Sequence, residues 1–146
     1  MGILLFRHGE AVKAHGSDEA RYLTMSGRSE TLAVARALHA RSMRPAQIVA
    51  SPLVRAVQTA EIIAHALGYE GLVTIEPSLV PDGDPRAAVR NVPMGAALVI
   101  CVCHEPIIRG IAAALTQQPS FHHFKTSGCA LIEGARVVLE LDPDRV

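Results

Sequence analysis

Arginine and histidine side chains stand near the ends of three apolar runs that predict buried strands. Arg7 and His8 directly follow the first run. Arg55 lies about one helical turn beyond the second, and His104 directly follows the fourth. A guanidinium group binds two phosphate oxygens at once, and a neutral imidazole can attack phosphorus as a nucleophile. The four residues therefore predict phosphoryl chemistry, provided that the fold brings them together.

Each of these residues also has a simpler interpretation. Arg7 could be a surface charge at a strand end, and His8 a capped loop histidine. Arg55 could be a solvated residue in the first turn of a helix, and His104 could merely close a strand. Their coincidence after three separate strands favours a shared site. Gly9, directly after His8, also allows the backbone to approach a ligand closely.

Short apolar runs alternate with longer stretches of helical periodicity along the chain. Strands are predicted at 3–6, 47–50, 73–75 and 97–102, helices at 25–42, 53–67, 85–91 and after Glu105-Pro106, and a hairpin at 129–132 and 137–141. Thr24 or Ser26 can cap the first helix, Gly68 can end the second, and Pro106 suits the first position of the last. The alternation predicts an α/β fold: a three-layer α/β/α sandwich with a mostly parallel sheet and a C-terminal hairpin.

This fold class explains how the four residues could meet. Ligands of open α/β sheets bind outside the carboxyl ends of the strands. Helices that begin at this edge contribute unpaired backbone N–H groups and the positive end of a dipole. Both features suit a phosphate group, so we expect the site at this edge of the sheet.

Composition excludes several other classes of protein. The 146 residues suit a single domain, residues 1–146, and the 14 Lys+Arg against 14 Asp+Glu give a formal net charge of zero. This balance and the 3% aromatic content argue against a nucleic-acid binder. The apolar runs are too short for a membrane span or a signal peptide, and the odd number of cysteines, three, is typical of reduced core residues. We expect a cytoplasmic monomer that does not bind membranes.

Four segments of the chain resemble the motifs of the histidine phosphatase superfamily, which has the phosphoglycerate-mutase-like fold. These are Arg7-His8-Gly9-Glu10, Leu23-Thr24-Met25-Ser26-Gly27, the ten residues from Ser51 to Ala60, and His104. The resemblance extends from residue 3 to about residue 132. The short chain, the short segment between residues 68 and 96, and Thr126-Ser127 look most like the small SixA-type phosphohistidine phosphatases.

The resemblance implies a role for each residue of the set. His8 is the nucleophile that becomes phosphorylated, while Arg7, Arg55 and His104 hold the phosphoryl oxygens. Arg21 is a further candidate for contact with substrate phosphate or a partner protein. Neither a metal nor another cofactor is required, because positive side chains stabilise the transferred charge. Cys101 and Cys103, which precede His104 on the predicted strand, are interpreted as core residues rather than metal ligands.

The substrate and the proton donor are less well determined. Larger relatives carry an acidic donor after the third strand, whereas here Asp82 and Asp84 do not fall clearly on that position. The donor could be Asp82, Asp84 or Glu10, or there could be none. A weak donor favours a protein-bound phosphohistidine of the phosphotransfer or two-component type, because imidazole can leave without one. The alternatives are a small-molecule phosphomonoesterase on the same scaffold and a non-catalytic phosphate-binding module.

Overall fold

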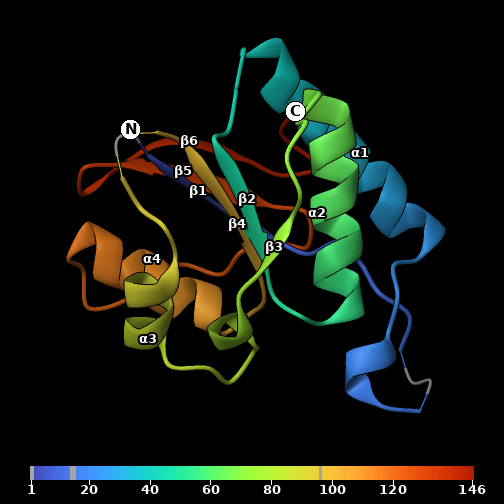
Figure 1. Cartoon of the computed structure of the whole chain (residues 1–146), viewed down its shortest axis with the longest axis horizontal. Helices are drawn as coiled ribbons and strands as arrows, with labels where there is room; N and C mark the ends of the chain where they lie inside the picture. The colour runs from blue at the N-terminus through green and yellow to red at the C-terminus, as the bar shows by residue number, and fades with distance from the viewer. Residues whose placement is uncertain (1, 14–15, 96) are drawn as a thin grey trace.

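The computed structural model describes residues 2–13, 16–95 and 97–146. These residues form a six-stranded sheet between two pairs of helices, with α1 and α2 on one face and α3 and α4 on the other (Figure 1). The strands are β1 (Ile3–Arg7), β2 (Gln47–Ala50), β3 (Thr74–Ile75), β4 (Val99–Cys103), β5 (Cys129–Glu133) and β6 (Arg136–Leu141). The helices are α1 (Met25–Ala40), α2 (Val54–Leu67), α3 (Pro85–Asn91) and α4 (Ile107–Thr116), with short 3-10 turns η1 (Asp18–Ala20) and η2 (Pro77–Leu79). The predicted three-layer fold is confirmed.

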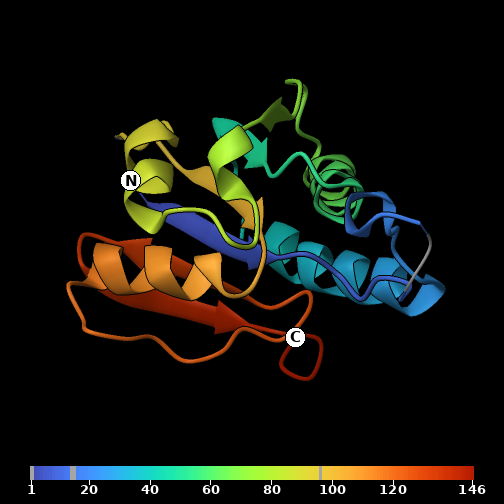
Figure 2. The ribbon, with the colours of Figure 1, turned by 90° about the horizontal axis from the view of Figure 1, so that it is seen from below.

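The strand order β3-β2-β4-β1-β5-β6 makes the sheet mostly parallel. The first four strands in this order run parallel to one another. β5 is antiparallel to both β1 and β6 and forms the predicted C-terminal hairpin with β6. The chain that leaves β1 runs toward the loop before α1 (Figure 2), so the carboxyl ends of β1, β4 and β2 lie at one edge of the sheet.

Alternating side chains of the strands fill two separate cores. In β1, Ile3 and Leu5 pack toward α3 and α4, whereas Leu4 and Phe6 pack toward α1 and α2. A strand that is apolar on both faces is typical of a central parallel strand, because helices cover both sides. The helices match this arrangement with apolar residues at helical spacing, such as Val34, Ala35 and Leu38 in α1.

Helix and strand ends differ from the sequence predictions by a few residues. The side-chain oxygen of Thr24 accepts from the backbone N–H of Gly27, so Thr24 rather than Ser26 caps α1. Gly68 ends α2 in the left-handed conformation, as predicted. Pro106 is the residue that caps α4 rather than its first residue, which corrects the prediction. β4 is displaced by one residue or two toward the carboxyl end and includes Cys103.

None of the helices within the described ranges is long and apolar enough to span a membrane.

Candidate active site

His8 and His104 lie side by side because they follow neighbouring parallel strands. β1 and β4 pair so that Arg7 is opposite Cys103, and the N–H of His8 continues this ladder by donating to the carbonyl of Cys103 at 3.1 Å. The centroids of the two imidazole rings are 5.0 Å apart. Ser51 follows β2 on the other side of β4, and its N–H donates to the carbonyl of Val102 at 3.0 Å. The predicted convergence of strand ends is therefore present.

The orientation of His8 is set by the residue that follows it. Its Nδ1 lies 2.7 Å from the carbonyl oxygen of Gly9. A carbonyl oxygen only accepts, so Nδ1 carries the proton and Nε2 of the neutral ring carries the lone pair. The N–H of Gly9 in turn donates to Oγ1 of Thr59 at 3.0 Å. These bonds fix the loop and leave Nε2 as the nitrogen of His8 that carries the lone pair.

Gly9 packs closely against α1, and the approach of a ligand to its backbone stays a prediction. A Cβ atom at Gly9 would lie 2.7 Å from Oγ1 of Thr31 and 2.8 Å from the carbonyl oxygen of Gly27. Backbone cannot move aside cheaply, so a larger residue would displace the loop that carries His8.

Both arginines are held by protein oxygens at one end of the guanidinium group. Nη1 of Arg7 donates to the carbonyl of Phe124 at 2.7 Å. Nη1 of Arg55 donates to the carbonyl of Asp18 at 2.9 Å, and its Nη2 lies 3.2 Å from Oδ2 of the same residue. His104 shows a similar arrangement, since its Nε2 lies 2.7 Å from Oγ of Ser51.

Among the residues that the structure describes, three buried side-chain polar atoms make no hydrogen bond. They are Nε of Arg7, Nε of Arg55 and Nδ1 of His104. Buried polar groups are normally paired, so each such atom calls for an explanation. All three belong to the residues predicted to hold a phosphoryl group. An anion with several oxygens would satisfy them.

Burial and positive neighbours keep both histidines neutral at neutral pH. Burial is the main cause that lowers the pKa of His8 to about 4, and Arg55 and Arg7 lower it further against the opposing Gly9 hydrogen bond. Burial also lowers the pKa of His104 to about 3, and the positive charges of protonated His8 and of Arg55 lower it further. Burial lowers the pKa of Arg7 as well, opposed by the charge of Glu105. A neutral His8 is the form that can attack phosphorus.

The sequence of the site region agrees with a known family. The model of the histidine phosphatase superfamily (branch 1) matches residues 3–80, more than half of the chain. The chain belongs to the histidine phosphatase superfamily. The phosphatase class that the sequence predicts is thereby confirmed.

SixA proteins are among the most similar members of this superfamily. Phosphohistidine phosphatase SixA of Escherichia coli (strain K12) is 29% identical over 138 residues, which cover 90% of this chain and 84% of the relative. A solved structure of SixA complexed with tungstate matches with a TM-score of 0.92 and 25% identity, covering 99% of this chain and 98% of that one. A putative SixA from Agrobacterium tumefaciens matches with a TM-score of 0.83 and 22% identity, covering 97% of each chain, and shows the shared fold.

The superfamily resemblance left the proton donor open, and the structure gives its three candidates different surroundings. Asp84 caps α3 by accepting from the N–H of Arg86 at 3.0 Å. Glu10 accepts from Oγ1 of Thr24 at 2.7 Å. Asp82 lines a cavity of about 520 Å³ beside the start of α2, together with Asp18, Glu19, Pro52, Leu53, Val80 and Pro81. Asp82 thus shares a cavity with Asp18, whose carboxylate contacts Arg55.

Arg21 contacts Asp18, which in turn contacts Arg55. Its Nη1 lies 2.9 Å from Oδ1 of Asp18, and its Nε donates to the carbonyl of Val12 at 2.7 Å. Its charge contributes to the lowered pKa of His8. A direct contact of Arg21 with substrate stays a prediction.

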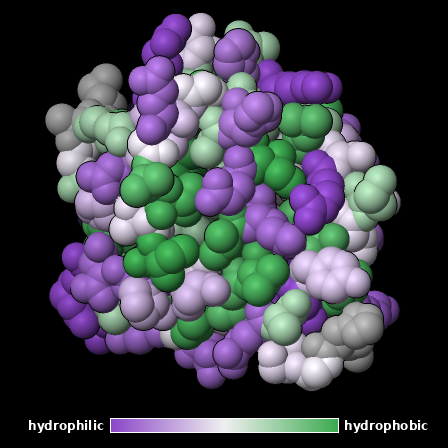
Figure 3. Space-filling view, turned by 45° about the vertical axis from the view of Figure 1, so that its right-hand side comes forward, coloured by the Kyte–Doolittle hydropathy of each residue, from purple (hydrophilic) through white to green (hydrophobic). Residues whose placement is uncertain are grey.

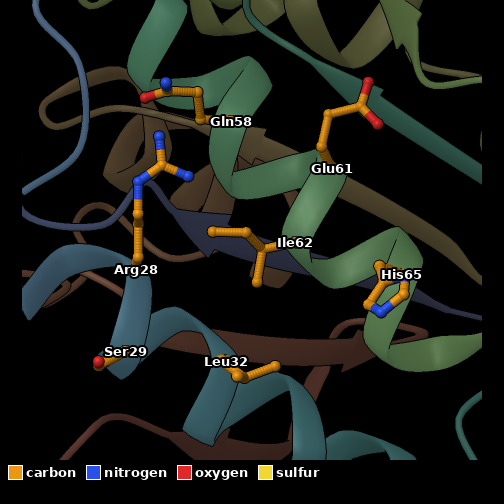
Figure 4. Close-up of a pocket in the computed structure, with 7 residues that line it drawn as sticks. All are labelled: Arg28, Ser29, Leu32, Gln58, Glu61, Ile62 and His65. Carbon is orange, nitrogen blue, oxygen red and sulfur yellow. The ribbon is translucent and has the colours of Figure 1, made fainter. Parts of the chain in front are cut away.

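A second hollow of about 410 Å³ lies between α1 and α2, and none of the four residues lines it (Figure 4). Leu32 and Ile62 contribute apolar surface to it, and Arg28, Glu61 and His65 contribute polar groups. In Figure 3 hydrophobic surface also gathers among hydrophilic side chains near the middle of the face shown. None of the residues that line this hollow contributes to the phosphoryl site.

The cysteines lie in the two cores. Cys101 and Cys103 are buried on the side of α3 and α4, and Cys129 is buried on the opposite side. Within the described ranges, no three side chains of His, Cys, Asp or Glu form a group that could hold a metal ion. Independence of metal remains a prediction for experiment.

The sequence did not predict the groups that hold the arginines and His104 by hydrogen bonds. Asp18, Ser51 and the carbonyl of Phe124 have these roles. Ser51 was placed at the strand end by the motif, but nothing in the sequence links it to His104. The carbonyl of Phe124 has no sequence signal at all, because every residue carries one.

Proposed function

We propose that this chain hydrolyses protein-bound phosphohistidine through an intermediate phosphorylated on His8. The observation that carries the proposal is the set of three unpartnered buried atoms, on Arg7, Arg55 and His104, around the neutral His8. Groups fixed in advance around a developing charge lower the barrier without reorganising during the reaction. The 29% identity to a phosphohistidine phosphatase supports the same substrate class.

The first step transfers the phosphoryl group to His8. The lone pair of Nε2 forms a bond to phosphorus while the P–N bond of the substrate breaks, and that electron pair stays on the substrate nitrogen. If the other ring nitrogen of the substrate carries a proton, the leaving group is a neutral imidazole. Arg7, Arg55 and His104 bind the equatorial oxygens, where the charge is spread.

The second step releases phosphate from the enzyme. Water attacks phosphorus, the P–N bond to His8 breaks, and the released proton goes to phosphate or solvent. The proton on Nδ1, held by the Gly9 carbonyl, ensures that His8 also leaves as a neutral imidazole. The same hydrogen bond therefore serves both steps.

The surroundings of the acidic residues support a phosphoramidate over an alkyl ester. An alkoxide leaving group needs a proton, and two of the three candidate donors, Asp84 and Glu10, already accept hydrogen bonds elsewhere. An imidazole that is already protonated needs no donor. The partner we propose is a histidine-phosphorylated protein of the phosphotransfer or two-component type. We propose that the enzyme is a monomer and acts in the cytoplasm.

Mass spectrometry of trapped enzyme tests the nucleophile. Brief incubation with a phosphohistidine protein should add one phosphoryl group to the native chain and none to His8→Ala. His39→Ala, at the exposed end of α1, is the matched control and should trap phosphate like the native chain. Undiminished turnover by His8→Ala would exclude His8 as the nucleophile.

A substrate panel tests the leaving group. Release of phosphate from a phosphohistidine protein should be faster than release from alkyl phosphates of sugars or nucleosides. A preference for the alkyl esters would replace the proposed substrate class by small phosphomonoesters. Binding of tungstate without any turnover would instead support a non-catalytic phosphate-binding module.

A further inference from the structure

Asp18 contacts Arg55 through two of its oxygens. The backbone carbonyl of Asp18 accepts from Nη1 of Arg55 at 2.9 Å, and Oδ2 of its side chain lies 3.2 Å from Nη2. The side chain of Arg55 is only 5% exposed, whereas that of Asp18 is 58% exposed. The contact therefore ties a buried cation of the site to a residue at the surface, in the short turn η1.

This contact uses one edge of the guanidinium group and leaves another available. A guanidinium has five N–H donors in a planar fork. Asp18 binds the edge formed by Nη1 and Nη2, while the buried Nε makes no hydrogen bond. The edge that includes Nε can still give a phosphoryl group two parallel hydrogen bonds. Asp18 and a phosphoryl group can therefore bind Arg55 at the same time.

Arg21 fixes the other side of the Asp18 carboxylate. Nη1 of Arg21 lies 2.9 Å from Oδ1, so Asp18 bridges Arg21 and Arg55. The hydrogen bond from Arg21, and then that from Arg55, lowers the pKa of Asp18. Asp18 is thus a carboxylate at neutral pH, which suits an acceptor and not a proton donor.

We infer that Asp18 is a positioning residue for the phosphatase reaction: it fixes the plane of the Arg55 guanidinium so that its Nε edge faces the transferred phosphoryl group. Asp18 acts through its contact with Arg55 and does not touch the reacting atoms. This inference rests on the proposed function, because it assigns Asp18 a part in phosphoryl transfer at His8. Nothing in the superfamily motifs of this sequence includes Asp18.

A double-mutant cycle tests whether Asp18 acts through Arg55. Asp18→Asn should lower kcat about tenfold or more, because small misplacements of positioning groups have effects of this size. In the Arg55→Ala background the same substitution should change kcat less than about twofold, because no guanidinium remains to be fixed. An equal loss in both backgrounds, or no loss in the native background, would overturn the inference.

The matched control is an aspartate in an exposed ion pair with a lysine. Asp144 lies 2.8 Å from Nζ of Lys125, and Asp144→Asn should leave kcat unchanged. Exposed ion pairs contribute little to folding stability, so thermal unfolding of Asp144→Asn should match that of the native protein. A loss of kcat in Asp144→Asn equal to that in Asp18→Asn would also count against a specific role for Asp18.

A spectroscopic measurement separates this inference from the proposed function. NMR of the Arg55 guanidinium reports rotation about its Nε–Cζ bond, which the two contacts with Asp18 should slow. Asp18→Asn should speed this rotation, whether or not the chain turns over a given substrate. Unchanged rotation would overturn the positioning role. Absence of turnover by the native chain would instead count against the proposed phosphatase reaction.

Discussion

The Nδ1–H of His8 donates to the carbonyl oxygen of Gly9 across 2.7 Å, so the imidazole is held by the residue next to it in sequence. In the proposed reaction this bond decides which nitrogen attacks, because the lone pair of the neutral ring must then be on Nε2. It persists when Nε2 carries a phosphoryl group, since it does not involve that nitrogen. One local contact therefore fixes the tautomer for both proposed chemical steps.

Titration of His8 should show a pKa of about 4, well below the ordinary value of 6.5. The cause is burial first, with the positive charges of Arg55 and Arg7 adding to it. NMR of the His8 ring measures this pKa directly, and the signal is assigned by its absence from the spectrum of His8→Ala. The neutral ring should also show its proton on Nδ1. A midpoint near 6.5 would mean that the ring is solvated and is not the poised nucleophile.

Folding stability should fall as the pH is lowered from about 6.5 toward about 4. In this range the unfolded chain binds protons at His8 and His104, whose folded pKa values are about 4 and about 3, and the folded chain does not. Each histidine should contribute about 1.4 kcal/mol of unfolding free energy per pH unit where only the unfolded state binds its proton. Above pH 6.5 both histidines are neutral in the folded and in the unfolded chain, so their contribution to the free energy of unfolding is constant.

Chemical denaturation of His104→Gln over the same pH range measures this contribution. The variant should lose stability less steeply than the native chain between pH 6 and about 4.5, because one of the two groups is gone. Carboxylates titrate equally in both proteins and cancel in the comparison. Identical slopes would show that His104 is not kept neutral by burial.

The fold could be predicted, and four candidate site residues could be proposed, because their signals are local. Apolar runs of one strand length mark the sheet, and Arg7, His8 and His104 are tied to strand ends by sequence position alone. Parallel strands then place these ends at one edge. The candidate site could therefore be proposed from the order of the short strands and helices along the chain.

Contacts between distant segments could not be predicted. Phe124 is 117 residues from Arg7, and Asp18 is 37 residues from Arg55. How the loops pack decides which carbonyl or carboxylate accepts hydrogen bonds from a guanidinium group. Polar residues are so common in loops that the sequence does not indicate which one makes this contact. The boundaries of β4 were missed for another reason: residues 97 and 98 are as apolar as the strand, so composition does not show where pairing begins.

Arg55→Lys should lower kcat/KM by about 10²-fold or more, about 2.7 kcal/mol of transition-state stabilisation. Lysine keeps the charge but loses the planar fork, including the Nε edge and the two bonds to Asp18. Steady-state kinetics measures the loss, and tungstate binding by calorimetry should also weaken. Near-native rates and affinity would make Arg55 a structural partner of Asp18 only.

EDTA should leave the rate of phosphate release unchanged, because positive charge at the site is assigned to Arg7 and Arg55. The measurement is turnover after dialysis against the chelator, with a zinc-dependent phosphatase as control. Loss of activity that returns with added divalent ion would require a metal in the reaction.

Ser51→Ala should lower kcat/KM by changing the tautomer of His104. Oγ of Ser51 accepts from the N–H of Leu53 at 3.2 Å, so its own proton is free to be donated to Nε2 of His104, 2.7 Å away. His104 is neutral, with a pKa of about 3, and must then carry its single proton on Nδ1. That buried atom, which makes no hydrogen bond, becomes a donor for a phosphoryl oxygen.

Without the hydroxyl of Ser51 the proton can move to Nε2, and a lone pair on Nδ1 would then face the phosphoryl oxygens. Removal of one preorganised donor costs about 10²-fold in rate, and we expect a loss of this order. NMR of the His104 ring nitrogens should show the proton on Nδ1 in the native chain and a shift toward Nε2 in Ser51→Ala. Ser29→Ala, on the exposed face of α1, is the control. A changed tautomer with an unchanged rate would show that His104 does not donate to the transferred group, and Arg7 and Arg55 would then stabilise its charge without it.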